Sequence, residues 1–139
     1  MQKVYSKINP EVLIHIIWRF KEGEAGKMNF IIPETECLQA AAGAYLPKDY
    51  MFGGVHKHLP QKRNIDKTQE AFVVISGSVE VDMYDLDNNF LFKEMLNPGD
   101  CYIYLGGAHA FKILEENTFF YELKNGTYYG REKDKEFIF

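Results

Sequence analysis

The sequence predicts an all-β protein, and three observations support that class. Residues that fit a pleated, half-buried surface dominate, since Ile, Val, Phe and Tyr together number 38 against 18 for Leu and Ala. The 11 Gly and 5 Pro residues suit many short strands joined by turns. Apolar residues at 79, 81 and 83 alternate with Glu80, Asp82 and Tyr84, which is the period of a strand with one wet face.

Turn signals divide the chain at intervals of roughly 8–12 residues, a spacing typical of a sandwich or a small barrel. Residues 10–20 fit either a short helix with Pro10 in its first turn or a strand, because the run is too short for periodicity to decide. The alanines of residues 37–46 favour a helix, but Gly43 and the flanking strands favour an extended segment, which we predict. The other expected strands lie at 29–32, 71–75, 79–84, 90–95, 101–105, 109–114 and 118–124.

One domain accounts for the 139 residues. Its barrel core is expected at about 29–124, with an N-terminal edge segment at 1–28 and a charged, solvated tail at 125–139. The net charge of −4 disfavours nucleic acid and anionic membranes as partners. The longest apolar run, residues 12–18, is interrupted by His15 and is far shorter than the ~20 residues of a membrane span.

The start of the chain shows no secretory signal pattern, so we expect a cytoplasmic protein. Two cysteines, Cys37 and Cys101, are too few for a disulfide framework, although a single bridge between them stays open.

The histidines are the residues most suggestive of chemistry. His56 and His58 are two residues apart, so on an extended strand both imidazoles face the same side and can meet one metal ion. Glu70 heads an otherwise apolar strand, where an unpartnered charge facing the core would be costly. His109 follows a strand and the Gly106-Gly107 pair. The alternatives are a chance surface pair, a solvated Glu70 and a core histidine.

Together these residues resemble the two motifs of the cupin superfamily. The first motif, a Gly-led His-x-His followed by a Glu and then a Gly, is supplied by Gly54, His56, His58, Glu70 and Gly77. The second, a Pro-Gly-Asp turn, a strand, a Gly-containing loop and a His, is supplied by Pro98, Gly99, Asp100, Gly107 and His109. The resemblance covers residues 38–124, and the ending of the chain is similar to that of the WbuC-like group of small cupin metalloproteins.

The resemblance implies a double-stranded β-helix, or jelly-roll barrel, with one divalent transition metal. Its ligands would be His56, His58, Glu70 and His109. Fe, Mn, Ni, Zn and Cu all suit three His and one Glu, so the metal stays open. Three departures from the family pattern stand out: eleven residues between His58 and Glu70, Leu105 in place of Pro, and Ile113 in place of Asn. The first implies a longer loop over the barrel mouth.

Five further residues are candidates for binding a substrate. Arg63 on the long loop can hold a phosphate or carboxylate, or it is a solvated cation. Phe72 and Phe111 follow Glu70 and His109 on the same strand phases and would line the pocket walls. Glu122 and Lys124 share a strand face, either as an acid/base pair inside the barrel or as a surface ion pair.

Two classes of function fit these candidates. One is a metal-dependent isomerase or epimerase acting on a small carbohydrate-like or sugar-nucleotide substrate in polysaccharide metabolism, with a metal-dependent dioxygenase as the redox alternative. The other is a module that binds a small polar or anionic ligand without turnover. No catalytic residue is assigned. We also expect a homodimer, with residues 12–18 covering a sheet edge in their own chain or in the partner.

Overall fold

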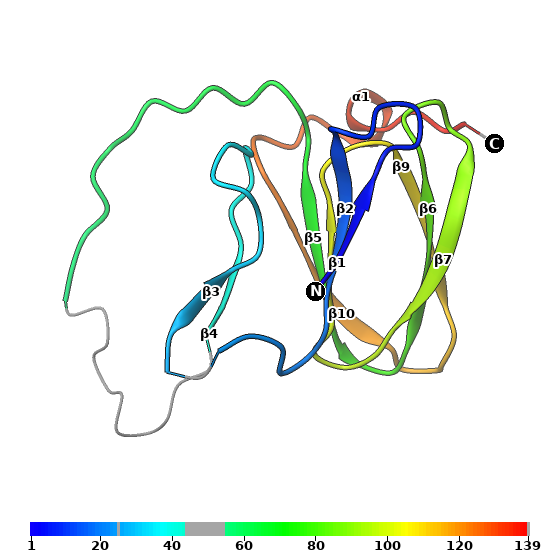
Figure 1. Ribbon diagram of the computed structural model, residues 1–139, viewed down its shortest axis with the longest axis horizontal. Helices are drawn as coiled ribbons and strands as arrows, with labels where there is room; N and C mark the ends of the chain where they lie inside the picture. The colour runs from blue at the N-terminus through cyan, green and yellow to red at the C-terminus, as the bar shows by residue number, and fades with distance from the viewer. Residues whose placement is uncertain (25, 44–54, 139) are drawn as a thin grey trace.

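The computed structural model describes residues 1–24, 26–43 and 55–138, and strands dominate these ranges (Figure 1). Antiparallel pairing joins every pair of neighbouring strands. The strands are β1 (Gln2–Tyr5), β2 (Leu13–Trp18), β3 (Met28–Phe30), β4 (Ala41–Gly43), β5 (Glu70–Ser76), β6 (Val79–Tyr84), β7 (Phe90–Leu96), β8 (Cys101–Tyr104), β9 (Ala108–Ile113) and β10 (Phe119–Lys124). The all-β class is confirmed.

Two sheets face each other across the main core. The five-stranded sheet has the order β1-β2-β8-β5-β10, and the three-stranded sheet has the order β7-β6-β9. Figure 1 shows β6, β7 and β9 opposite β1, β2 and β5. Apolar side chains from both sheets fill the space between them: Ile17, Phe72, Val74 and Tyr102 from one, and Val79, Val81, Met83 and Leu96 from the other. The described strands do not close into a continuous barrel.

A second apolar cluster covers the opposite face of the five-stranded sheet. The β3–β4 ribbon and the chain that follows β3 bring Ile31 and Ile32 against Ile16, Trp18 and Ile103. Successive strand residues point to opposite faces, so β2 and β8 supply side chains to both cores. This explains why the run Leu13–Trp18 is apolar at nearly every position instead of alternating.

The N-terminal segment is part of the main sheet. Residues 10–20 contain the strand β2, which pairs with β1 on one side and with β8 on the other. The expected core of 29–124 is therefore too short at its start, and the sheet edge is β1 instead of the apolar run. In the segment 37–46, the structure describes a short strand at Ala41–Gly43, and residues 44–46 lie outside the described residues.

The Pro-Gly-Asp turn is held by the buried carboxylate of Asp100. Its oxygens accept hydrogen bonds from the backbone N–H of Phe20 at 2.9 Å and of Asn97 at 3.0 Å. Arg19 adds a charged bond at 2.9 Å. Gly99 adopts a φ of 88°, and a Cβ there would lie 2.5 Å from the Phe20 ring. The turn therefore needs Gly at 99 and locks β8 to the end of β2.

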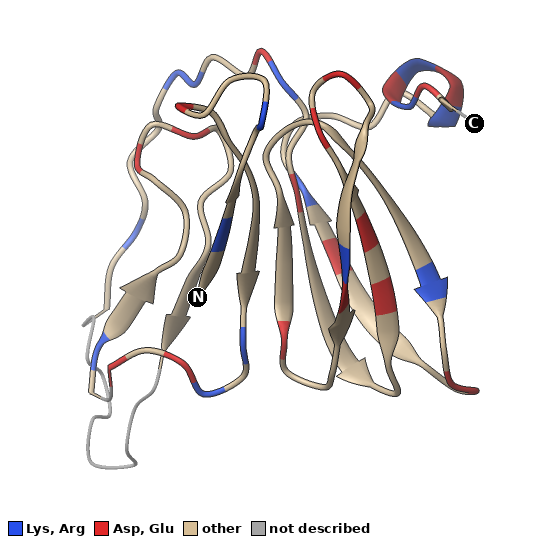
Figure 2. Ribbon diagram, turned by 45° about the vertical axis from the view of Figure 1, so that its right-hand side comes forward, with Lys and Arg blue, Asp and Glu red and all other residues tan. Residues whose placement is uncertain are grey.

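The C-terminal tail was expected to be solvated, but part of it contacts the sheet. Arg131–Asp134 forms a short helix, α1, in which every residue is charged (Figure 2). Asp134 reaches back to Lys124 of β10, with Oδ2 2.7 Å from Nζ. Among the residues that the structure describes, no helix has the length and apolar character needed to span a membrane.

Candidate functional site

Glu70 and His109 meet between the two sheets. Glu70 is the first residue of β5, and His109 is the second residue of β9. Glu70 Oε2 lies 3.4 Å from His109 Nε2, and the two side chains are 8% and 17% exposed. The strand phases expected from the sequence therefore bring together the carboxylate and one of the three imidazoles.

A lysine approaches the other oxygen of this carboxylate. Lys124 Nζ lies 3.7 Å from Glu70 Oε1, because β10 pairs with β5 in a register that sets Lys124 opposite Glu70. The hydrogen bond that the protonated His109 ring would donate through Nε2 lowers the pKa of Glu70, outweighing the opposing effect of burial, and the positive charge of Lys124 lowers it further. Burial opposes the charge on Lys124, yet the hydrogen bond and charge of Asp134, with the charge of Glu70, raise its pKa. Glu70 is therefore a carboxylate at neutral pH.

The sequence prediction named Lys124 together with Glu122, and the structure separates the two. Lys124 pairs with Glu70 and Asp134, whereas Glu122 is exposed on β10. The acid/base pair expected from their spacing is therefore not formed, because Lys124 pairs with the carboxylates of Glu70 and Asp134 instead.

Three residues of the site were not singled out from the sequence: His15, Tyr102 and Tyr104. Tyr102 OH lies 2.9 Å from His15 Nδ1 and 3.2 Å from His109 Nδ1. The Tyr104 ring lies 4.7 Å from the His109 ring, and its hydroxyl donates to the carbonyl of Gly107 at 2.9 Å. The two tyrosines occur two residues apart on the strand before His109, so their shared face was a usable signal. His15 lies within the apolar run of residues 12–18, where no spacing to another polar residue pointed to a site.

Phe72 and Phe111, which the strand phases place on the pocket walls, contact each other between the two sheets, and their role in lining a pocket stays a prediction. Their rings stack with centroids 4.2 Å apart, and Phe120 stacks on the other side of Phe72 at 4.1 Å. The Phe111 ring lies 5.0 Å from the His109 ring. Phe72 is 3% exposed, so it belongs to the packed core.

His56 and His58 lie elsewhere in the structure. Their rings are 5.2 Å apart, so they do form a pair, but residues 55–68 are exposed throughout and contain no strand. The condition under which the two imidazoles would share a strand face is not met, since Pro60 cannot donate to a strand ladder and the segment offers little apolar surface to bury. Figure 1 shows the chain swinging far from the sheets before it enters β5. Arg63 is exposed on the same segment.

The structure therefore brings together two of the four predicted metal ligands, Glu70 and His109. Within residues 1–24, 26–43 and 55–138, no three His, Cys, Asp or Glu side chains are grouped closely enough to hold a metal ion. The donor types at the Glu70–His109 pair suit a divalent transition metal, but His56 and His58 are not beside them. The four-ligand site stays a prediction. Cys37 and Cys101 are free thiols.

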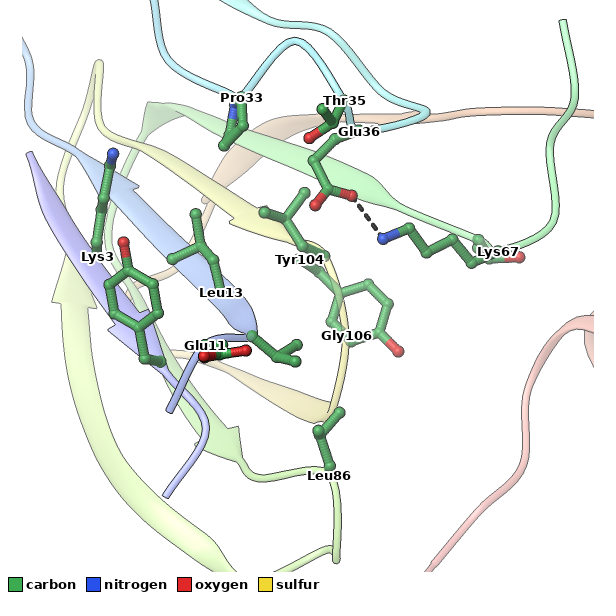
Figure 3. Close-up of a pocket in the computed structure, with 14 residues that line it drawn as sticks. Lys3, Glu11, Leu13, Pro33, Thr35, Glu36, Lys67, Leu86, Tyr104 and Gly106 are labelled. Carbon is green, nitrogen blue, oxygen red and sulfur yellow. Dashed lines mark ion pairs between the residues drawn. The ribbon is translucent and has the colours of Figure 1, made fainter. Parts of the chain in front are cut away.

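A cavity of about 690 Å³ shares Tyr104 with the site, but neither Glu70 nor His109 lines it (Figure 3). Lys67 and Glu36, which pair at 2.6 Å, are two more of its lining residues. Gln69 is fully buried nearby, and it accepts from the Leu38 N–H and donates to Glu36. These contacts anchor the end of the long exposed segment directly before Glu70.

Comparisons with known proteins add no relative. A scan against protein-family models, a search of curated proteins and a search of solved structures each found no match.

Proposed function

We propose that this chain is a metal-binding protein of the cupin type, with a double-stranded β-helix built from the two facing sheets. The contact between Glu70 and His109 carries the proposal. The two residues come from different motifs and different sheets, yet their metal-binding atoms face each other in a largely buried space. A carboxylate and an imidazole nitrogen are two of the donors that the cupin resemblance implies.

His56 and His58 would complete the ligand set. Eleven residues separate His58 from Glu70, and the last of them, Gln69, is anchored by hydrogen bonds to Glu36 and Leu38. A chain of that length spans at most about 40 Å and can fold back on itself, so connectivity permits the histidines to approach Glu70. Because the segment is exposed and lacks strand pairing, little native structure opposes such a rearrangement.

The charges of the site favour an anionic or oxygen-rich small molecule. A divalent ion neutralised by one carboxylate keeps a local charge near +1, and Lys124 adds a second cation next to Glu70. When bound, the metal would supply Lewis-acid polarisation of a substrate oxygen. Arg63, if the segment folds back with His58, would bring a group suited to phosphate or carboxylate.

For the reaction, we propose isomerase or epimerase chemistry on a small carbohydrate-like or sugar-nucleotide substrate. Such reactions move a proton at a carbon next to a carbonyl, and they need acid and base groups near the substrate. Tyr104 lies beside His109 and forms part of the cavity wall, and Lys124 lies beside Glu70. These two side chains are the proton-carrying groups that the proposal favours. The alternatives to an isomerase or epimerase are a metal-dependent dioxygenase and a module that binds a ligand without turnover.

Two measurements on protein purified without an affinity tag test the proposal. Elemental analysis should find one transition-metal ion per chain, and reconstitution of metal-free protein should restore that ratio. Incubation of the metal-loaded protein with sugars and sugar nucleotides should then give an isomer of one of them. Thermal stabilisation by a sugar without conversion would support the binding module, consumption of oxygen would support the dioxygenase, and no metal uptake by any preparation would overturn the metal site.

A further inference from the structure

A buried hydrogen-bonded chain leads from the backbone to His109. His15 on β2 is fully buried; its Nε2 lies 3.0 Å from the carbonyl oxygen of Tyr84, and its Nδ1 lies 2.9 Å from Tyr102 OH. The same hydroxyl lies 3.2 Å from His109 Nδ1. Tyr102 is 1% exposed, so no water competes for its hydroxyl. These three hydrogen bonds link Tyr84, His15, Tyr102 and His109 in a continuous series.

The Tyr84 carbonyl at one end of this series determines which atoms of His15 and Tyr102 carry hydrogen. A carbonyl oxygen only accepts, so His15 Nε2 must carry a hydrogen. The His15 ring is fully buried, and its two nitrogens face a carbonyl oxygen and a hydroxyl instead of a carboxylate, so a charge on it would be costly; the ring is neutral and its Nδ1 has a lone pair. Tyr102 therefore donates its single proton to His15. Its oxygen is left as an acceptor toward His109 Nδ1.

We propose that Tyr102, oriented by His15, is a positioning residue that holds His109 in the tautomer with hydrogen on Nδ1, so that the Nε2 lone pair faces Glu70. The importance of this tautomer rests on the proposed function, because a metal binds the unprotonated nitrogen of a neutral imidazole and the partner of the other nitrogen selects which one that is. The tautomer itself is a property of the metal-free protein.

This arrangement creates a place for a cation. In the neutral tautomer, a lone pair on His109 Nε2 and an oxygen of the Glu70 carboxylate face each other at 3.4 Å. Two acceptors at that distance repel unless a proton or a metal ion lies between them. Without the Tyr102 oxygen, the neutral ring would instead place its hydrogen on Nε2 and donate to Glu70. Tyr102 thus works against the hydrogen bond that would block the metal-binding nitrogen.

Nitrogen-15 NMR of the metal-free protein tests the tautomer directly. Long-range proton–nitrogen correlations at about pH 9, more than two units above the ordinary histidine pKa of about 6.5, report which ring nitrogen is protonated. We expect hydrogen on Nδ1 of His109 and on Nε2 of His15. In Tyr102→Phe, which keeps the ring in the core, His109 should change to the Nε2-protonated form. Tyr104→Phe is the matched control, since that hydroxyl bonds Gly107 instead of a histidine, and it should leave the tautomer unchanged.

Zn²⁺ affinity, measured by competition with a chromophoric chelator, provides the second readout. Tyr102→Phe should weaken Zn²⁺ binding about 10- to 100-fold, as loss of an outer hydrogen-bond partner typically does, while Tyr104→Phe changes it less than about threefold. An Nε2-protonated His109 in the unmodified protein, or an unchanged tautomer in Tyr102→Phe, overturns the inference. If the tautomers follow expectation but the unmodified protein binds no Zn²⁺ and no other metal, the inference holds and the proposed function fails.

Discussion

His109 and Glu70 contact each other across the two sheets, with the imidazole on β9 and the carboxylate on β5. Each is supported from its own side. Tyr102 lies at the far nitrogen of His109, and Lys124 lies at the far oxygen of Glu70. The contact therefore sits in the middle of a row of polar groups that runs from the buried His15 to Asp134 of α1.

Removing the charge of Glu70 should weaken metal binding. In Glu70→Gln the oxygen remains at nearly the same place but the anionic donor is lost, so we expect the metal affinity to fall at least about tenfold, measured by chelator competition. Glu122→Gln removes an exposed carboxylate two residues before Lys124 and should leave the affinity unchanged. Equal losses in both variants would point to a general charge effect instead of a ligand.

Arg63→Ala should weaken ligand binding and leave the metal in place. The guanidinium is suited to bidentate bonds with phosphate or carboxylate, and its exposed position means that its loss should not affect folding. Calorimetry with phosphorylated sugars and small carboxylates on metal-loaded protein measures the effect. Unchanged affinity in Arg63→Ala would remove Arg63 from the site.

Acid should destabilise the fold through His15 before most carboxylates titrate. Its folded-state pKa of about 4 lies below the unfolded value of 6.5, so the unfolded chain binds the proton first as pH falls. Between pH 6.5 and 4 this group should lower the free energy of unfolding by about 3 kcal/mol. Tyr102, Tyr104 and His109 surround the ring, with Asp85 close enough for its charge to act.

Urea unfolding at a series of pH values checks this expectation, and an NMR titration of the His15 ring assigns it. The ring should remain neutral down to about pH 4. In His15→Phe, which we expect to be less stable at pH 7, the slope between pH 6.5 and 4 should largely disappear. A His15 ring that titrates near 6.5 in the folded protein would contradict the prediction.

Asp100→Ala should cost about 2–4 kcal/mol of stability. The substitution leaves two backbone N–H groups, those of Phe20 and Asn97, without their acceptor and removes one of the two carboxylates that pair with Arg19. Glu94→Ala is the matched control, because Glu94 pairs with the same arginine at a site about a third exposed, and its loss should cost less than about 1 kcal/mol. Denaturant midpoints of the two variants distinguish a buried turn acceptor from a surface ion pair.

The homodimer expected from the sequence should be visible by light scattering. Both ends of the five-stranded sheet, β1 and β10, are edges, and Tyr121 and Leu123 of β10 are more than half exposed. Unprotected edges with apolar neighbours favour pairing. We expect a mass of about twice the 16.2 kDa of one chain at high micromolar concentration, and a single-chain mass there would contradict it.

The strand pattern from residue 70 onward was predictable from local signals alone. Alternation at Val79–Tyr84 and the turns at Gly77 and Asp100 depend only on residues a few positions apart. The same local phases correctly set Glu70 and Phe72 on one face and His109 and Phe111 on another. Where local signals conflicted, as in residues 10–20, pairing with β1 and β8 decided for a strand.

The partners of each polar group were decided by tertiary structure. The sequence alone identified Glu70 and His109 as candidates, but Tyr102 and His15 enter the site only because β2, β8 and β9 pack around one core. The spacing of His56 and His58 predicts a shared face only if the segment is extended and paired, and an exposed polar segment with Pro60 gains no such pairing. Residue spacing along a chain determines which side chains can share a face, whereas burial and strand order determine which of them meet.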